Sequence, residues 1–354
     1  MVISFLVNLF VIGFSLILGF GSAVNSPADF LVKPQKIENK GIYLTAYIAG
    51  MKQRREELVD LINQTELNSV VIDVKDYSGM IFFDTNLAEV DKIGAEDIRI
   101  SDLKNWLKYL KQQGIYTIAR ITVFQDPYLA ENKPEIALKS KSGGIWRDKK
   151  GLAWVDPTQR YVWEYNINLA KETAKLGFDE INFDYIRFPS DGDIKQIVYA
   201  NLDKNGDKSK VMADFYQYLD QSLTFYPVLT SGDMFGMVLW RNDGLNIGQR
   251  FEDAAPHFDY ICPMVYPSHY PPGFKDFANP ADHPYEIVFQ SLDRVKNAKY
   301  RAKVRPWLQA FDMGAVYDDQ KIRLQKKATY DSGGYGWLLW NASNRYTNKG
   351  LDKN

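Results

Sequence analysis

Apolar and polar side chains alternate in short stretches along this chain, and alternation with a period of two predicts a β-strand. The clearest stretch is residues 178–184, where Ile181 and Phe183 share one face while Asn182 and Asp184 share the other. The same pattern predicts strands over residues 42–48, 70–75, 115–124, 178–184, 227–233, 260–266, 304–311 and 335–340. In several of these strands the polar side chains lie on one face. That face would point to the interior if the strands closed into a barrel.

Apolar residues at helical spacing occupy most of the segments between these strands. They predict helices over residues 52–64, 102–113, 157–176, 210–224, 247–255, 285–297 and 317–330. Asp156 followed by Pro157 favours the start of the third helix, because a carboxylate can cap it and proline suits its first position. Strands that alternate with helices are typical of parallel β/α units, so eight of them predict a (β/α)8 TIM barrel over residues 41–347.

Two segments are longer than a simple connection. Residues 76–100 predict an insertion with a small hairpin at 79–83. Residues 125–155 predict a long loop that carries Trp146 and Trp154, and loops of this length are usually functional or disordered.

The N-terminal segment is apolar over residues 2–20, with only three polar side chains. Gly21, Ser22 and Ala23 are small, as signal cleavage requires, although no Lys or Arg precedes the apolar run. Residues 1–23 therefore predict a signal peptide or a membrane anchor, followed by a linker at 24–40 and, after the barrel, a tail at 348–354. We expect an exported protein, secreted or associated with the cell envelope, that contacts the membrane only if the segment stays uncleaved.

Composition excludes several classes of function. The net charge is −1 with both signs interspersed, which gives no sign of a nucleic-acid partner. The single cysteine, Cys262, allows no intramolecular disulfide. The three histidines show no metal-ligand spacing, so we expect no metal and no cofactor. Asp203, Asn205 and Asp207 resemble half of a calcium loop, but Lys208 stands where that motif needs glycine, which favours a solvated turn.

Residues 177–189, Gly-Phe-Asp-Glu-Ile-Asn-Phe-Asp-Tyr-Ile-Arg-Phe-Pro, resemble a signature of the putative glycosyl hydrolase domain family. Residues 262–270, 41–45 and 340–343 fit the same family, and the resemblance covers about residues 40–347. It implies a TIM barrel distantly similar to those of α-amylases and α-galactosidases, and a carbohydrate as the partner.

The resemblance also implies catalytic positions. In α-amylase-like barrels the fourth strand ends in an Asp nucleophile, the fifth carries a Glu acid/base and the seventh carries an Asp. Asp184, Asp233 and Asp312 stand at the corresponding predicted strand ends. Two positions depart from that pattern, because the fifth strand has Asp in place of Glu and Asn182 replaces an Arg two residues before the nucleophile.

Hydrolysis of a glycosidic bond needs one carboxyl group that protonates the leaving oxygen and another that attacks the sugar or activates water. Asp184 and Asp233 lie on neighbouring strands and satisfy this need, and Arg187 or Lys75 is expected to keep Asp184 ionised. Aromatic residues near strand ends are expected to stack on sugars, although each alone is more often part of a core. The expected substrate-binding set is Tyr47, Asp73, Lys75, Arg120, Arg187, Tyr266, His269, Trp307, Gln309, Trp340 and Asn341.

The sequence thus predicts a glycoside hydrolase that acts on an extracellular or cell-wall polysaccharide. A non-catalytic carbohydrate-binding barrel of the cell envelope is the alternative, favoured by the missing Glu on the fifth strand. A third reading is a structural envelope protein, which an exposed apolar patch away from the strand ends would favour.

Overall fold

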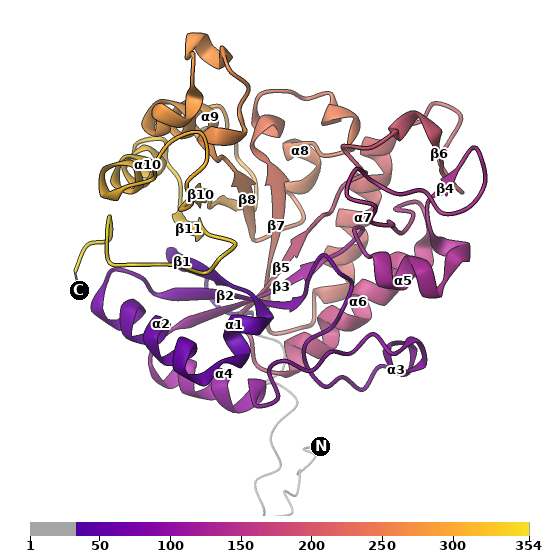
Figure 1. The fold of residues 1–354 in the computed structure, drawn as a ribbon, viewed down its shortest axis with the longest axis horizontal. Helices are drawn as coiled ribbons and strands as arrows, with labels where there is room; N and C mark the ends of the chain where they lie inside the picture. The colour runs from indigo at the N-terminus through magenta and orange to yellow at the C-terminus, as the bar shows by residue number, and fades with distance from the viewer. Residues whose placement is uncertain (1–32, 354) are drawn as a thin grey trace, which may run out of the picture.

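Parallel strands close into a barrel at the centre of the molecule, with helices around them (Figure 1). The computed structural model describes residues 33–353, so the predicted signal or anchor at 1–23 lies outside the described residues. No helix within residues 33–353 is long and apolar enough to span a membrane. The predicted (β/α)8 barrel is confirmed.

Eight strand positions form the barrel of residues 33–353, and every pairing between them is parallel. The seventh position is split, because Arg305 and Pro306 separate two short strands and proline has no N–H to donate to a ladder. In order around the barrel the strands are β1 (Asn39–Leu44), β2 (Ser69–Lys75), β3 (Tyr116–Thr122), β5 (Glu180–Asp184), β7 (Leu229–Phe235), β8 (Tyr260–Met264), β9 (Lys303–Val304) with β10 (Trp307–Gln309), and β11 (Gly336–Trp340).

Helices cover the outside of this barrel and bury its outward apolar face (Figure 1). They are α1 (Ala46–Gly50), α2 (Lys52–Gln64), α3 (Ala88–Ile93), α4 (Leu103–Gln112), α5 (Pro127–Asn132), α6 (Arg160–Lys175), α7 (Lys208–Leu223), α8 (Phe251–Ala254), α9 (Pro284–Asp293) and α10 (Asp319–Asp331). Ile181 and Phe183 of β5 are completely buried in this layer, as their alternation predicts.

Some predicted boundaries are wrong, each for a local reason. The first strand ends at Leu44 because the Thr45 side chain accepts a hydrogen bond from the Ile48 N–H and caps α1. Helix α6 starts at Arg160 because the Asp156 carboxylate accepts from the backbone of residues 158 and 200 instead of capping it.

The two long insertions also differ from prediction. The hairpin expected at residues 79–83 is reduced to one antiparallel bridge between Lys75 and Ile81, and α3 follows it. Residues 125–155 are ordered, with α5 and strand β4 (Lys139–Ser140), which pairs with β6 (Ile197–Val198) to form a small lobe beside the barrel (Figure 1).

The amino-terminal end of the barrel is closed by the chain that leads into β1. The Tyr260 hydroxyl at the start of β8 bonds both the N–H and the carbonyl of Ile37, each at 2.9 Å. The Lys36 amine donates to the Arg301 carbonyl at 2.8 Å. Residues 33–38 therefore pack against the face of the barrel where the strands begin.

Candidate active site

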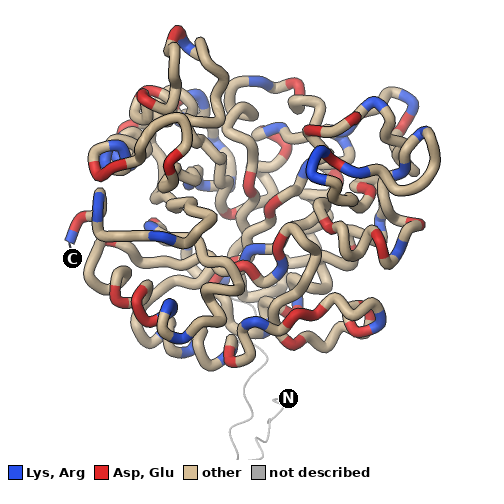
Figure 2. The backbone as a smooth tube through the Cα atoms, in the orientation of Figure 1, with Lys and Arg blue, Asp and Glu red and all other residues tan. Residues whose placement is uncertain are grey.

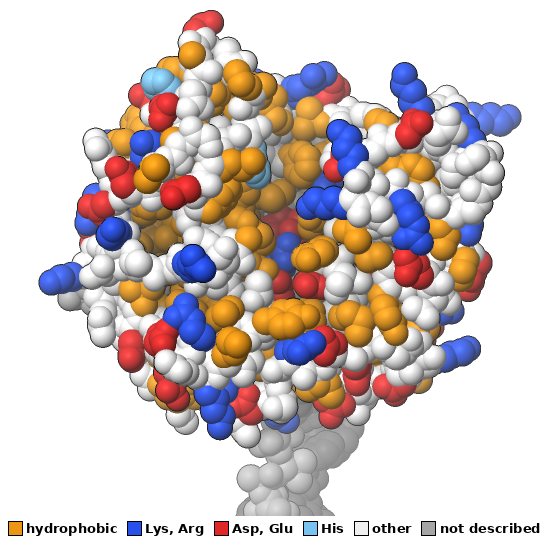
Figure 3. Space-filling view, viewed as in Figure 1, with side chains coloured by type: hydrophobic (Ala, Val, Ile, Leu, Met, Phe, Trp, Pro, Cys, Tyr) orange, Lys and Arg blue, Asp and Glu red, His pale blue; other side chains and the backbone are white. Residues whose placement is uncertain are grey.

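A cavity of ≈ 360 Å³ opens where the strands end. Figure 3 shows this face hollowed at its centre, with acidic and basic side chains at the bottom and hydrophobic ones around them. The carboxyl ends of barrel strands carry the active site in essentially every characterised TIM-barrel enzyme. The cavity is lined by Arg120, Asp184, Tyr185, Arg187, Asp233, Phe235, Gly236, Met237, Met264, Tyr266, His269, Tyr270, Trp307 and Trp340.

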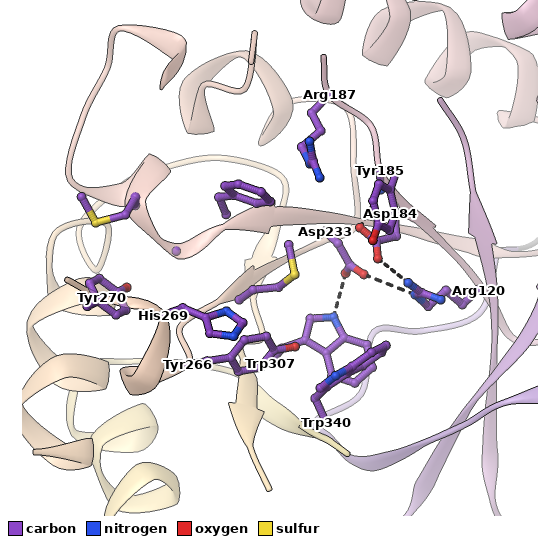
Figure 4. A pocket seen from close by; sticks show the side chains of 14 residues that line it. Arg120, Asp184, Tyr185, Arg187, Asp233, Tyr266, His269, Tyr270, Trp307 and Trp340 are labelled. Atoms are coloured by element: carbon purple, nitrogen blue, oxygen red, sulfur yellow. Dashed lines mark hydrogen bonds and ion pairs between the residues drawn. The ribbon is translucent and has the colours of Figure 1, made fainter. Parts of the chain in front are cut away.

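The guanidinium of Arg120 on β3 joins three carboxylates at the floor of the cavity. Its Nη1 lies 2.6 Å from Asp73 Oδ1 and its Nη2 lies 2.5 Å from Asp184 Oδ2. Its Nε lies 4.0 Å from Asp233 Oδ2, which is too far for a hydrogen bond. One buried cation therefore serves three buried acids, and Figure 4 shows its contacts with Asp184 and Asp233.

Asp184 ends β5 and receives two hydrogen bonds to different oxygens. Arg120 donates to Oδ2 at 2.5 Å, and the backbone N–H of Tyr185 donates to Oδ1 at 2.6 Å. Tyr185 has a φ of 52°, an unusual value for a residue other than glycine, and this turn directs its N–H back to the carboxylate. Both contacts fix the orientation of the Asp184 carboxylate.

Asp233 on β7 is held asymmetrically. Its Oδ1 accepts hydrogen bonds from Asn182 Nδ2 and Trp307 Nε1, both at 2.8 Å, whereas no described residue donates to its Oδ2. Burial, with a further contribution from the negative charge of Asp184, raises the pKa of Asp233 to about 8. Oδ2 is therefore the oxygen that can hold a proton at neutral pH.

Asp73 and Tyr43 form the outer part of this network. The Tyr43 hydroxyl donates to Asp73 Oδ2, and burial raises the pKa of Asp73 to about 6 although Arg120 opposes the rise. The Tyr43 ring stacks on Trp340 at 4.0 Å between centroids, and Arg120 lies 5.2 Å from the centre of the Trp340 ring. These contacts fix the position of Arg120.

Aromatic side chains form one wall of the cavity (Figure 4). The Trp307 and Trp340 rings meet edge to face at 5.5 Å, and Tyr266 meets His269 in the same way at 5.1 Å. Burial lowers the pKa of His269, so its imidazole is neutral near pH 7. A wall of rings above paired acids has the shape and chemistry that a sugar requires.

Eight of the predicted site residues come together here: Asp184, Asp233, Arg120, Arg187, Tyr266, His269, Trp307 and Trp340 line the cavity. Asp73 lies one contact behind it, through Arg120. The guanidinium that contacts Asp184 is that of Arg120, so the expectation that Arg187 or Lys75 would do so is wrong.

Lys75 and Tyr47 were expected inside the barrel but lie outside it. The strand pairing shifts register between Asp73 and Lys75, which turns Lys75 outward to Asp126, at 2.8 Å, and to Asn166 of α6. Tyr47 lies on α1, half exposed, with its ring against Phe82.

The remaining three predicted residues lie just past or behind the cavity. Asp312 is exposed and accepts a hydrogen bond from the Tyr317 N–H, because the strand that was expected to reach it ends at Gln309. Gln309 is buried and holds the loops at residues 268, 311 and 313 through its amide. Asn341 donates to the carbonyls of Ala310 and Arg345, so it organises loops as well.

The structure adds residues to the site that are absent from the predicted set. Asn182 replaces the Arg of the α-amylase pattern, and it binds Asp233 while the guanidinium for Asp184 comes from β3. Tyr43 lies on the inward face of β1, and the alternation of that strand could have indicated this position. Phe235 and Tyr185 also line the cavity, but nothing in the local pattern distinguishes them from core residues.

Residues 33–353 contain no group of three His, Cys, Asp or Glu side chains arranged to hold a metal ion. In the segment that resembled a calcium loop, Asp207 caps α7 by accepting from the Lys210 N–H.

Comparison with known proteins identifies relatives over most of the chain. The family model described as putative glycosyl hydrolase domain matches residues 41–346. A hypothetical protein from Ruminiclostridium thermocellum is 38% identical, with a TM-score of 0.50 over 54% of this chain and 96% of that one. No curated protein matches the chain.

Two more distant structures share the fold. The PgaB (BpsB) glycoside hydrolase domain from Bordetella bronchiseptica has a TM-score of 0.62 at 14% identity, over 86% of this chain and 94% of that one. The α-galactosidase TtGalA from Thermus thermophilus, solved with p-nitrophenyl α-D-galactopyranoside, has a TM-score of 0.55 at 11% identity, over 88% of this chain and 59% of that one.

Proposed function

Because the chain belongs to the putative glycosyl hydrolase domain family, we propose that its cavity hydrolyses glycosidic bonds with Asp184 and Asp233 as the two carboxyl groups. The observation that carries the proposal is the difference between these neighbours. Asp184 is bound by a guanidinium and an N–H, whereas Asp233 has a pKa raised to about 8 and one oxygen to which no residue of 33–353 donates. Environments that separate two acids in this way assign them different roles.

In the proposed mechanism Asp233 Oδ2 donates its proton to the glycosidic oxygen as that bond breaks. Asp184 attacks the anomeric carbon and forms a glycosyl ester with the protein. Asp233, now ionised, takes a proton from water, and the resulting hydroxide attacks the anomeric carbon and releases Asp184. Arg120 holds Asp184 in line throughout, and the mechanism predicts that the configuration of the sugar is retained.

Trp307 has two roles in this proposal. Its N–H fixes Oδ1 of Asp233, which turns Oδ2 toward the leaving oxygen, and its ring belongs to the wall on which a sugar would stack. Figure 4 shows Trp307 and Trp340 on one side of the carboxylates and Arg187 on the other.

The test is a screen of polysaccharides and aryl glycosides with the wild type and Asp184→Asn. Asp184→Asn is nearly isosteric, so we expect the fold to persist while activity falls by about 10³-fold or more. Near-wild-type turnover by the variant would make Asp184 structural and refute the mechanism. Binding of sugars without cleavage by the wild type would instead support the non-catalytic carbohydrate-binding barrel.

For the location, we propose that the protein acts outside the cytoplasmic membrane on a polysaccharide of the cell surface or surroundings. The apolar run at residues 2–20 supports export. N-terminal sequencing of the mature protein tests this: a start at Val24 indicates cleavage, intact Met1 in the membrane fraction indicates an anchor, and intact Met1 in the cytoplasm refutes export.

A further inference from the structure

Arg187 is a buried cation at the cavity for which no carboxylate within residues 33–353 is close enough to form an ion pair. Its side chain lies in the loop after β5 and is 8% exposed. Within residues 33–353, only its Nη1 donates hydrogen bonds, to the Phe188 carbonyl at 3.1 Å and to Ser190 Oγ at 3.2 Å. The other three buried arginines of residues 33–353, which are Arg55, Arg120 and Arg305, all contact carboxylates.

Three aromatic rings surround the Arg187 guanidinium. Its carbon lies 4.6 Å from the centre of the Phe235 ring, 5.0 Å from Tyr185 and 5.1 Å from Trp154. Ring faces favour a cation but offer no strong acceptor for its N–H groups. Burial lowers the pKa of Arg187, although Tyr185 and the more distant charges of Asp184, Asp191 and Asp148 oppose the fall.

The guanidinium of Arg187 points into the cavity (Figure 4). Nε and Nη2 donate to none of the described residues, and Arg187 is one of the residues that line the cavity. Figure 4 shows the guanidinium pointing toward the two carboxylates from the side away from Trp307 and Trp340. A ligand on the aromatic wall would therefore present its opposite edge to Arg187.

The acids of the floor do not exclude an anion from this position. Asp184 and Asp73 are both in contact with Arg120, which offsets one of their two negative charges. Asp233 is protonated below about pH 8, so it adds no negative charge at neutral pH. Of the two arginines that line the cavity, Arg187 is the one that contacts no acid of residues 33–353, and Asp184, Asp191 and Asp148 act on its charge only from beyond contact distance.

The lobe beside Arg187 is also suited to a polyanion. Trp154, one of the rings around Arg187, is at the base of this lobe, which consists of residues 134–155 and 190–200. Lys141, Lys149, Lys150 and Lys195 are exposed on it, and none forms an ion pair with an acid of residues 33–353. Figure 2 shows basic residues along this lobe, with acidic residues among them. Unpaired lysines near a cleft attract anionic ligands from a distance.

We propose that Arg187 binds the carboxylate of a uronic acid, so that the substrate of this cavity is an acidic glycan. The inference rests on the proposed function for its catalytic consequence. A guanidinium and a carboxylate have matching forked geometries, and a hydroxyl uses only one arm of the fork. The aromatic wall would take the face of the same sugar, and the carboxylate would fix its orientation over Asp184 and Asp233.

The experiment measures affinity by tryptophan fluorescence on the full chain at pH 7 and low salt. The probes are glucuronate, galacturonate and their tetramers, each beside its methyl ester, which keeps the shape and removes the charge. We expect the acids to bind about tenfold or more tightly than the esters. Equal affinity of acids and esters, or no binding of either, overturns the proposal.

Two variants and a control locate the effect. Arg187→Gln should reduce the affinity for the acid to that for the ester, and Arg187→Lys should keep only part of the preference because it loses the fork. Arg160→Gln is the matched control, because Arg160 also lies over rings, 5.3 Å from Trp163, but is exposed and outside the cavity. Retention of the preference in Arg187→Gln overturns the proposal.

Activity separates this proposal from the one on which it rests. Cleavage of neutral glycans alone, abolished in Asp184→Asn, would keep the hydrolase and overturn the role of Arg187. Binding of the acids that depends on Arg187, with no glycan cleaved, would support the role of Arg187 and overturn the proposed hydrolase.

Discussion

Two buried arginines inside the same barrel differ in the number of carboxylates that surround them. At the amino-terminal end, Arg305 donates to both oxygens of Glu180, at 2.5 Å and 3.0 Å, and to Asn39 Oδ1 at 2.6 Å. Both charges are completely buried, and one cation meets one carboxylate. At the carboxyl-terminal end, Arg120 meets three carboxylates.

The difference shows that buried arginine–carboxylate contacts can either stabilise the fold or raise the pKa of a nearby acid. A balanced, bidentate pair fixes the packing of the strands and leaves no group free to exchange a proton. An excess of carboxylates around one cation leaves a negative charge that burial makes unfavourable, and the pKa of Asp233 rises in response. The Arg305–Glu180 pair therefore stabilises the barrel, whereas the cluster of Arg120 with its three carboxylates provides the groups proposed for catalysis.

Asp233→Asn should produce the largest effect on this comparison. Loss of the proton donor should lower the rate by about 10²- to 10⁴-fold on substrates with a poor leaving group, and by less on activated aryl glycosides. Kinetics on the two substrate types test this, with Asp312→Asn as the control, because that exposed carboxylate lies outside the cavity. Equal losses on both substrate types would contradict the role of Asp233 as the acid.

Arg305→Met should instead act on stability. It leaves Glu180 as an unpaired buried charge, and breaking such a pair lowers the free energy of unfolding by about 3–5 kcal/mol. Urea denaturation measures the change, and the double variant Arg305→Met/Glu180→Leu should recover much of the loss. If Arg305→Met were as stable as the wild type, the Arg305–Glu180 pair would not contribute to the stability of the barrel.

The pH dependence of stability is the third test of this comparison. In the folded protein Asp233 keeps its proton up to about pH 8, whereas an unfolded carboxyl loses it near the ordinary value of 3.8. The unfolded state is thus favoured as the pH rises from about 4 to about 8, and Asp233 subtracts stability over that window.

Urea midpoints of the wild type and Asp233→Asn at pH 5 and pH 8 test this sign. The variant lacks the titrating group, so its stability relative to the wild type should increase from pH 5 to pH 8. A relative stability that falls over the same range would mean that the pKa of Asp233 is not raised.

The sequence predicts the barrel well because the signal for it is repeated. Eight stretches of alternation each specify a strand, and parallel neighbours bring residues at their ends to one face. The register that pairs Asn182 with Ser231 is enough to set Asp184 and Asp233 near each other at that face. Arg120 was predictable as an inward residue, but its three partners depend on strands far apart in sequence.

The errors concern positions where a local event overrides the period of two. A register shift turns Lys75 away from the cavity, and the Thr45 cap turns the end of the first predicted strand into α1, which carries Tyr47 outward. The end of β10 at Gln309 leaves Asp312 in an exposed turn. Each event depends on neighbours in space, so alternation alone cannot reveal it.

The contacts of Lys36 and Ile37 beneath the barrel have a consequence for how the molecule can be attached. They fix the point where the chain joins the barrel on the face opposite the cavity. A tether joined through residues before Lys33 would therefore attach the molecule by the face opposite the cavity. A long polymer could then cross the open face without meeting the surface to which the molecule is fixed, and immobilisation through this end should leave its access to the cavity intact.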